Sequence, residues 1–118
     1  MNGSTSADYN EAIKLKSNYA KAYYNRGNAY RDKIDFDKAV LDYTKGIDLN
    51  PDYVDAYYNR GKLYDEADEC DKAIEDCRAV IKLEPEHADA YSYRGTLYRD
   101  KGEHDKAIED FKRFLENR

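Results

Sequence analysis

The hexapeptide AYYNRG at residues 22–27 recurs unchanged at residues 56–61, and a variant, AYSYRG, stands at residues 90–95. Each copy begins 34 residues after the previous one. A fixed period of this length is typical of proteins that stack one small supersecondary unit. We therefore divide the chain into units at residues 20–53, 54–87 and 88–118, the last of which stops three residues short of a full period.

Each unit contains two apolar stripes with the spacing of an α-helix. The first follows i, i+4 and i+7 on one helix face: Tyr23, Gly27 and Tyr30, then Tyr57, Gly61 and Tyr64, then Tyr91, Gly95 and Tyr98. The second follows i, i+4 and i+8: Ala39, Tyr43 and Ile47, then Ala73, Cys77 and Ile81, then Ala107, Phe111 and Leu115. Each unit is therefore expected to be a pair of helices.

The predicted helix ends fall at the same places in successive units. A proline disfavours helix in the residue before it, so the second helices should end near Pro51 and Pro85. A glycine inside a helix costs roughly 1 kcal/mol relative to alanine. The glycine that recurs at one position of each first helix therefore predicts a close approach between helices. Short turns between paired helices are expected at Asp35, Glu69 and Glu103.

This arrangement resembles the tetratricopeptide repeat (TPR) family, whose pattern is an aromatic residue, Leu-Gly, Tyr, a spaced Ala, a second aromatic residue and Pro. In the first unit the matching residues are Tyr23, Gly27, Tyr30, Ala39, Tyr43 and Pro51. The second unit has Cys77 at the second aromatic position, and the third stops before any proline. The resemblance implies an all-α fold, a right-handed α-solenoid of stacked helix-turn-helix TPR units.

The sequence departs from the family pattern at Arg26, Arg60 and Arg94, where leucine is usual. One interpretation is a ladder of cations that contacts an anion or an acidic peptide. We favour the alternative that the arginine stems pack between repeats while the guanidinium groups pair with nearby carboxylates. The reason is that these residues point away from the face expected to bind a ligand.

Both ends of the chain differ from the complete units. Residues 1–7 are expected to be a polar, flexible leader. Residues 8–19 (DYNEAIKLKSNY) align one period earlier with residues 42–53 (DYTKGIDLNPDY), so we expect them to be half of a second helix from a preceding repeat. At the other end, the third unit is expected to be truncated, without the polar capping helix that usually closes such an array.

The first helix of each unit should line the concave side of the array. Residues one step beyond the core stripe are rotated by about 100° and should face this groove. Tyrosine offers rigid aromatic area there, and asparagine offers amide groups for a peptide backbone. The resemblance implies the same, since TPR grooves commonly hold peptides; the alternative is a solvated helix face. We therefore expect a partner peptide to contact Tyr24, Asn25, Asn28, Tyr58, Asn59, Lys62, Tyr93 and Arg99.

One functional subtype of the family can be compared residue by residue. Co-chaperone members hold the C-terminal carboxylate of heat-shock chaperones with lysines, asparagines and an arginine on their first helices. Asn28 and Asn59 match two of those five positions. The other three hold Tyr24, Asp89 and Tyr93, and an aspartate would repel the carboxylate. We therefore expect that a heat-shock chaperone C-terminal tail is not the ligand.

Composition and charge argue against several other functions. The net charge is −5 with acidic and basic residues interspersed, which disfavours nucleic-acid binding. No apolar run is long enough to span a membrane. Signatures of catalysis and of phosphate binding are missing, so we expect neither an enzyme nor a cofactor. Cys70, Cys77 and His104 lack the close spacing of metal ligands, so no metal is expected.

The two cysteines indicate a reducing environment. Cys70 and Cys77 lie seven residues apart in a helical pattern, which separates their Cα atoms by about 10 Å. That distance is too long for a disulfide bond. Both are therefore expected to be thiols, which suits a cytoplasmic location.

A second hypothesis is self-association through the ends of the array, giving a homo-oligomer. Phe114 stands where the earlier units have Gly46 and Val80, a position that usually needs a small residue. An uncovered patch with two Phe favours self-association. The alternative is a fragment cut from a longer protein. The residues expected to form the patch are Ile108, Phe111, Phe114 and Leu115.

Overall fold

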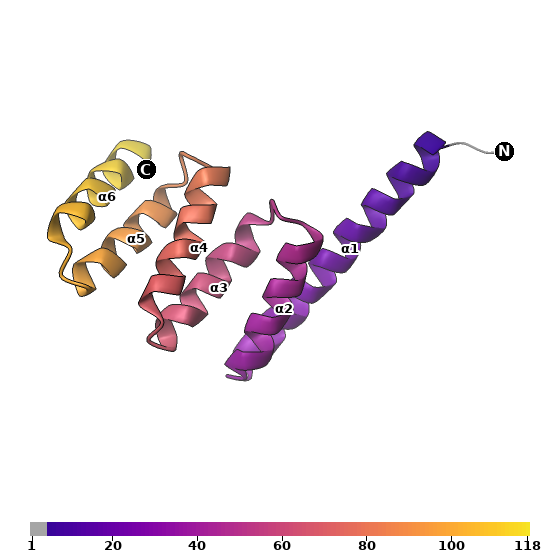
Figure 1. Ribbon diagram of the computed structural model, residues 1–118, viewed down its shortest axis with the longest axis horizontal. Helices are drawn as coiled ribbons and strands as arrows, with labels where there is room; N and C mark the ends of the chain where they lie inside the picture. Colours follow the sequence, from indigo (N-terminus) through magenta and orange to yellow (C-terminus); the bar gives the residue numbers. More distant parts are fainter. Residues whose placement is uncertain (1–4) are drawn as a thin grey trace. The chain divides into compact units, whose positions relative to one another are not determined.

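The computed structural model describes the backbone of residues 5–118, together with the side chains of residues 11, 12 and 14–118. Over this range the chain forms six α-helices and no strand (Figure 1). The all-α fold predicted from the sequence is confirmed. The helices are α1 (Thr5–Asp32), α2 (Phe36–Leu49), α3 (Val54–Glu66), α4 (Cys70–Leu83), α5 (Ala88–Asp100) and α6 (His104–Asn117).

The helices belong to two compact units, the first of which ends at Tyr53 and the second of which begins at Val54. The first unit contains the helix pair α1–α2. The second contains the pairs α3–α4 and α5–α6, which pack on each other through α4 and α5. Each pair is a helix hairpin with a short turn, as the two apolar stripes of the sequence predicted.

The first helix is longer than the sequence predicted. Residues 8–19, expected to be a separate half-helix, continue without a break into the first predicted helix, so that α1 is 28 residues long. The reason is that residues 16–19 read KSNY, where the aligned residues 50–53 read NPDY. Pro51 cannot continue a helix, whereas Ser17 can. Of the predicted leader, residues 5–7 belong to α1, and residues 1–4 lie outside the described residues.

Glycines allow the two helices of each pair to approach closely. A Cβ atom added at Gly27 would lie 2.8 Å from a ring carbon of Tyr43, and one at Gly95 would lie 2.9 Å from a ring carbon of Phe111. Such distances are shorter than carbon atoms tolerate in a close-packed interior. The close approach predicted from the recurring glycine is therefore confirmed.

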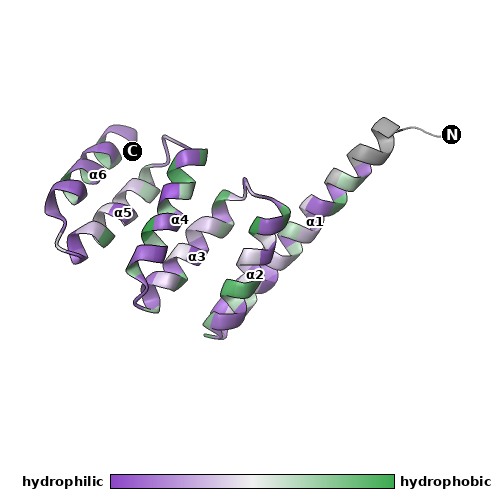
Figure 2. Cartoon of the chain, viewed as in Figure 1, coloured by the Kyte–Doolittle hydropathy of each residue, from purple (hydrophilic) through white to green (hydrophobic). Residues whose placement is uncertain are grey.

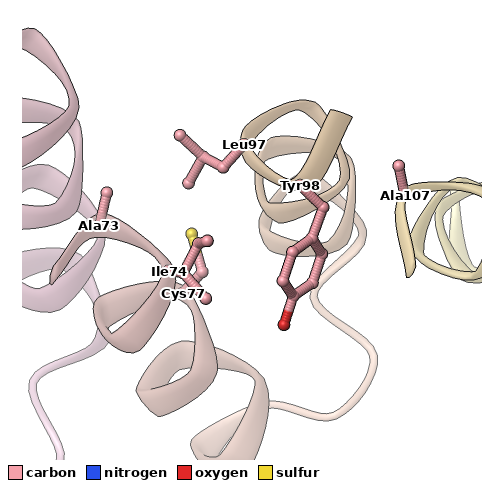
Figure 3. Packing of buried hydrophobic residues seen from close by; sticks show 6 residues of the cluster. All are labelled: Ala73, Ile74, Cys77, Leu97, Tyr98 and Ala107. Carbon is pink, nitrogen blue, oxygen red and sulfur yellow. The ribbon is translucent and has the colours of Figure 1, made fainter. Parts of the chain in front are cut away.

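The core of the second unit is built from side chains of three helices. Burying a residue such as Leu97 stabilises the fold by about 1.5–3 kcal/mol. Figure 2 shows that α4 carries hydrophobic residues among hydrophilic ones. Figure 3 shows the buried cluster, which consists of Ala73, Ile74 and Cys77 from α4, Leu97 and Tyr98 from α5, and Ala107 from α6.

No helix in the described part of the chain is long and apolar enough to cross a membrane.

The turns inside the three helix pairs share a residue with a left-handed backbone. Ile34, Asp68 and Gly102 occupy the same place in successive repeats, with φ of 61°, 63° and 83°. Glycine adopts this conformation freely and aspartate tolerates it, but a β-branched residue is strained there. Ile34 is 74% exposed, so packing does little to offset the strain.

We expect Ile34→Gly to stabilise the first unit by about 0.5–1 kcal/mol, because glycine relieves the strained turn. The opposite change at the equivalent position, Gly102→Ala, should destabilise the second unit by about 1 kcal/mol. Nothing lies within 4 Å of a Cβ added at Gly102, so that effect reports backbone conformation alone. Urea unfolding followed by circular dichroism measures both changes, and a lower unfolding midpoint for Ile34→Gly would contradict the assignment of strain.

Candidate functional site

One arrangement of side chains recurs in all three helix pairs: an arginine of the first helix holds an aspartate of the second with two hydrogen bonds. Arg26 Nε and Nη2 donate to Asp42 Oδ2 and Oδ1 at 2.7 and 2.8 Å. All three aspartates are almost fully buried, with 1–4% of their surface exposed. The other two pairs, with distances of 2.7–3.0 Å, are Arg60 with Asp76 and Arg94 with Asp110.

Each of these guanidinium groups also lies near two tyrosine rings of its own helix. Arg26 is 5.6 Å from the ring centre of Tyr23 and 5.8 Å from that of Tyr30. The tyrosines stand three residues before and four residues after the arginine, which is the spacing of neighbours on a helix face. Distances of 5.6–5.8 Å likewise join Arg60 to Tyr57 and Tyr64, and Arg94 to Tyr91 and Tyr98.

The paired arginines have a structural role. Hydrogen bonding to Asp110 raises the pKa of the Arg94 guanidinium, and hydrogen bonding to Asp42 does the same for Arg26. Two parallel hydrogen bonds between planar groups fix the geometry of each pair as well as satisfying the buried carboxylate. The predicted pairing with carboxylates is confirmed. Because two donors of each arginine are used within its own helix pair, the pairing disfavours a ladder that binds an anionic ligand.

The eight residues predicted to contact a peptide are all at least partly accessible. Three lie on α1 in the first unit, three on α3 and two on α5 in the second unit. Arg99 also lies 3.7 Å from the carboxylate of its neighbour Asp100. On the second unit, the structure brings together Tyr58, Lys62 and Tyr93. Asn25, Lys62 and Arg99 are exposed, and the half-buried members are Tyr24, Asn28, Tyr58, Asn59 and Tyr93.

On the second unit, side chains of α3 and α5 form a joint surface of Tyr58, Lys62, Asp65 and Tyr93, which we call the Tyr58–Tyr93 surface. The two rings are 6.0 Å apart and edge-on, and Lys62 Nζ lies 4.7 Å from the centre of the Tyr58 ring. Tyr93 donates its hydroxyl to Asp65 Oδ2 at 2.8 Å, which links the two helices. Burial raises the pKa of Tyr58, and burial together with this hydrogen bond raises that of Tyr93. Both phenols therefore stay protonated near neutral pH.

On the first unit, the predicted residues are tied to α2. The Tyr24 ring contacts those of Tyr43 and Tyr53, at centroid distances of 5.7 and 5.0 Å. Asn28 Oδ1 accepts a hydrogen bond from the Tyr43 hydroxyl. Burial raises the pKa of Tyr43 to about 12, so its hydroxyl remains a donor at neutral pH. Asn28 therefore helps to hold α1 against α2.

Two aromatic residues that support these surfaces were missed by the sequence reasoning. Tyr53 contacts Tyr24, and the His87 ring lies 5.5 Å from that of Tyr58. Both stand in the connection before a first helix, where helical periodicity gives no signal. The period itself could have found them, because each lies 29 residues after the tyrosine that it contacts. His87 also caps α5, since Nδ1 accepts from the backbone N–H of Ala90 at 3.1 Å.

The cysteines behave as core residues. Cys70 and Cys77 are free thiols. Burial raises the pKa of both thiols, that of Cys77 to about 12, which keeps them protonated near neutral pH. Among the residues that the structure describes, no group of His, Cys, Asp or Glu is arranged to hold a metal ion.

The four residues predicted for self-association differ in how far they are buried. Phe111 packs toward α5, against Gly95 and the core cluster, and Phe114 is half-buried. Ile108 and Leu115 are exposed. Ile108 and Leu115 are therefore the most exposed of the four, and both Phe side chains are partly accessible.

Comparison with known proteins places the chain in a family. Residues 6–33 and 27–68 match a family model described as TPR repeat, and residues 58–118 match one described as Tetratricopeptide repeat. The chain belongs to the tetratricopeptide repeat family. TPR domains are in general protein-interaction modules rather than enzymes, and the family match supports a role in protein interaction for this chain. None of the curated protein sequences compared with the chain matches it.

Solved structures share this fold. A crystal structure of MamA is 36% identical, with a TM-score of 0.83 over 92% of this chain and 67% of that one. A second MamA structure is also 36% identical, with a TM-score of 0.81, and the match covers 92% of this chain and 63% of that one. The second TPR of Spaghetti (RPAP3), bound to the HSP90 peptide SRMEEVD, is 27% identical, with a TM-score of 0.84 over 92% of this chain and 99% of that one.

The repeated ion pair can be tested by restoring the leucine of the family pattern. Arg94→Leu should destabilise the second unit by about 3–5 kcal/mol, because it leaves Asp110 buried without its cation. The double change Arg94→Leu/Asp110→Ala should recover much of this loss, since no unpaired charge remains. Urea unfolding measures both.

Arg78→Leu is the matched control. Arg78 pairs with Glu75 on the surface of α4, and both side chains are more than half exposed. An exposed pair contributes at most about 1 kcal/mol, so this variant should unfold almost like the wild type. Equal losses for Arg94→Leu and Arg78→Leu would show that burial of the aspartate does not matter.

Proposed function

We propose that this interaction module binds a peptide segment of a partner protein through its first helices, α1, α3 and α5. The observation that carries the proposal is the Tyr58–Tyr93 surface, in which half-buried rings from two helices meet beside a lysine and an aspartate. Rings that are already held by their neighbours lose little freedom on binding, and tyrosine offers both apolar area and a polar group. Such a surface suits a peptide ligand.

Asn25 and Asn59 are the residues that we propose to orient the peptide. They occupy the same position in successive repeats, on α1 and α3. An amide side chain can donate to a backbone carbonyl and accept from a backbone N–H of an extended peptide. Asn59 follows Tyr58 directly, so a peptide that covers the Tyr58–Tyr93 surface would come within reach of its amide. Tyr24, Asn28 and Arg99 complete the proposed contacts.

The proposed ligand is not a chaperone tail. The second TPR of Spaghetti shares the fold and was solved with an HSP90 peptide of sequence SRMEEVD, which carries three acidic residues and a single arginine. In the present chain, two of the positions where chaperone-binding members have cations hold Asp89 and Tyr93 on α5. Asp89 is exposed, and its charge would repel an acidic tail. The net charge of −5 likewise disfavours nucleic acid as a partner.

The proposed location is cytoplasmic. Cys70 and Cys77 are free thiols, and thiols persist in reducing compartments.

A peptide selected from an unbiased library on the wild-type protein provides the probe for this function. We expect Asn25→Ala/Asn59→Ala to abolish its capture without lowering helicity. Lys62→Ala should weaken binding about tenfold, because it removes the cation that lies over the Tyr58 ring. Fluorescence polarisation with the labelled peptide measures affinity, and circular dichroism measures helicity.

Lys72→Ala is the matched control for Lys62→Ala. Lys72 also lies over a tyrosine ring, 5.4 Å from the centre of Tyr64, but it is on the second helix α4. It should leave binding of the selected peptide unchanged. If Asn25→Ala/Asn59→Ala still captures the selected peptide like the wild type, the proposed peptide site is contradicted.

We also propose self-association as a second function, because α6 presents apolar side chains to solvent. Ile108 and Leu115 are 53% and 57% exposed. They lie seven residues apart, so they share one face of the helix. Covering apolar surface is favourable by about 25 cal/mol per Å². Packing of this face of α6 on another protein surface is therefore favourable.

Light scattering over a dilution series should show that the wild-type mass rises with concentration. Ile108→Glu should keep the protein monomeric to a higher concentration. Leu41→Glu is the matched control: Leu41 is 54% exposed on α2, and the equivalent residues of the other repeats are already glutamates, Glu75 and Glu109. A wild-type protein that stays monomeric throughout would remove this second function.

A further inference from the structure

Two faces of the molecule are exposed although their counterparts within the chain are covered. On α6, Ile108 is 53% exposed, whereas Ile74, one repeat earlier, is 5% exposed. On α1, the Arg26 side chain is 56% exposed, whereas that of Arg94, two repeats later, is 17% exposed. Ile74 is covered because α4 packs on α5, and Arg94 of α5 lies near Cys77 of α4. The exposed face of α6 therefore corresponds to the α4 side of that interface, and the exposed face of α1 corresponds to its α5 side.

The interface between α4 and α5 shows how two such faces fit together. At its centre, Ile74 and Cys77 of α4 pack with Leu97 of α5 (Figure 3). At its edge, Lys101 Nζ donates to Asp71 Oδ1 at 2.5 Å. One period of 34 residues leads from α4 forward to α6, and two periods lead from α5 back to α1.

We propose that α6 of one copy packs on α1 of a second copy in the way that α4 packs on α5 within the chain. The α6 face of each copy is then covered by α1 of a second copy, and its α1 face by α6 of another. This inference rests on the self-association proposed above and specifies its two surfaces and their orientation. A contact between different patches is heterologous, so a pair of copies still presents one free face of each kind and can grow further.

Charged residues at the edge fit this register. Asp71 corresponds to Asp105 on α6, and Lys101 corresponds to Lys33, directly after α1. Asp105 and Lys33 are both exposed. In the proposed contact, Asp105 of one copy meets Lys33 of the next, which preserves the sign of each partner. An exposed ion pair adds little affinity, but it favours the correct register over alternatives.

At the centre of the proposed contact, the large and the small apolar side chain come from the opposite helices to those of the internal interface. The internal interface sets the small Cys77 against the large Leu97. The corresponding residues are Phe111 on α6 and Ala29 on α1, so the large side chain now comes from α6 and the small one from α1. The pair keeps nearly the same total volume, which is the kind of change that packed interfaces tolerate best.

A pocket on the first unit adds a place for an aliphatic side chain. It has a volume of about 480 Å³ and is lined by Tyr19, Ala22, Tyr23 and Arg26 of α1 and by Leu49 of α2. This part of α1 corresponds to the beginning of α5, which follows the end of α4 after a short turn. In the proposed register, the end of α6 with the exposed Leu115 therefore comes close to the pocket.

Complementation between two single variants tests the arrangement. Ile108→Glu places a carboxylate on the α6 face, and Ala29→Glu places one on the α1 face. Both positions are exposed and glutamate is a good helix former, so both variants should fold. Each variant alone should associate at least about tenfold more weakly, because a buried carboxylate without a partner is unfavourable. An equimolar mixture should form a dimer, since the intact α6 of Ala29→Glu can pack on the intact α1 of Ile108→Glu.

Sedimentation velocity measures the masses, and Leu41→Glu, which should associate like the wild type, is the control. If Ala29→Glu alone associates like the wild type, contact between two α6 helices replaces the head-to-tail arrangement, and this inference falls while self-association stands. If the mixture stays monomeric, the inference also falls. A wild type that never associates overturns both. Should either glutamate variant lose helicity, Ile108→Gln and Ala29→Arg provide a second pair with the same expected pattern.

Discussion

A carboxylate buried between two helices loses its hydration, which is unfavourable unless a cation or other hydrogen-bond donors replace the lost water. In each helix pair of this protein the cation is an arginine 16 residues earlier, as Arg60 is for Asp76. Two parallel hydrogen bonds between planar groups have one good geometry, so they set the position of the second helix against the first. The glycine that follows each arginine lets the helices come close, as at Gly61, where an added Cβ would lie 3.1 Å from the Cβ of Asp76.

This ion pair differs in energy from the leucine that is usual in the family. A buried pair contributes less net stability than apolar side chains of the same volume, because both charges lose their hydration. It penalises misplacement instead, since a helix that slides or rotates leaves its carboxylate unpaired. The tyrosines beside each guanidinium support the cation through their ring faces. Six of the 13 tyrosines serve this purpose, which explains much of the unusual tyrosine content.

The 34-residue period was sufficient to predict the helix pairs, their turns and the close approach at Gly27, because one pattern written three times leaves few folds that satisfy it. The direction in which the arginines point on their helix predicted that they pair with carboxylates, but not with which ones. Asp42 lies on the next helix, and periodicity describes one helix at a time. The length of α1 was missed for a different reason. The alignment of residues 8–19 with 42–53 matched the apolar residues and passed over Ser17, which stands where Pro51 ends α2.

The candidate surfaces were harder to predict than the core, because they depend on residues that the repeats do not share. Tyr93 stands where the earlier repeats have Asn25 and Asn59, and it reaches from α5 to α3 to bond Asp65. Asn28, which accepts from Tyr43, is replaced by lysine and threonine in the other two repeats. Each contact therefore occurs once, and no comparison of one repeat with the next could reveal it. The same differences make the two surfaces chemically distinct. The rings of the Tyr58–Tyr93 surface lie beside Lys62 and Asp65, whereas the Tyr24 ring contacts those of Tyr43 and Tyr53.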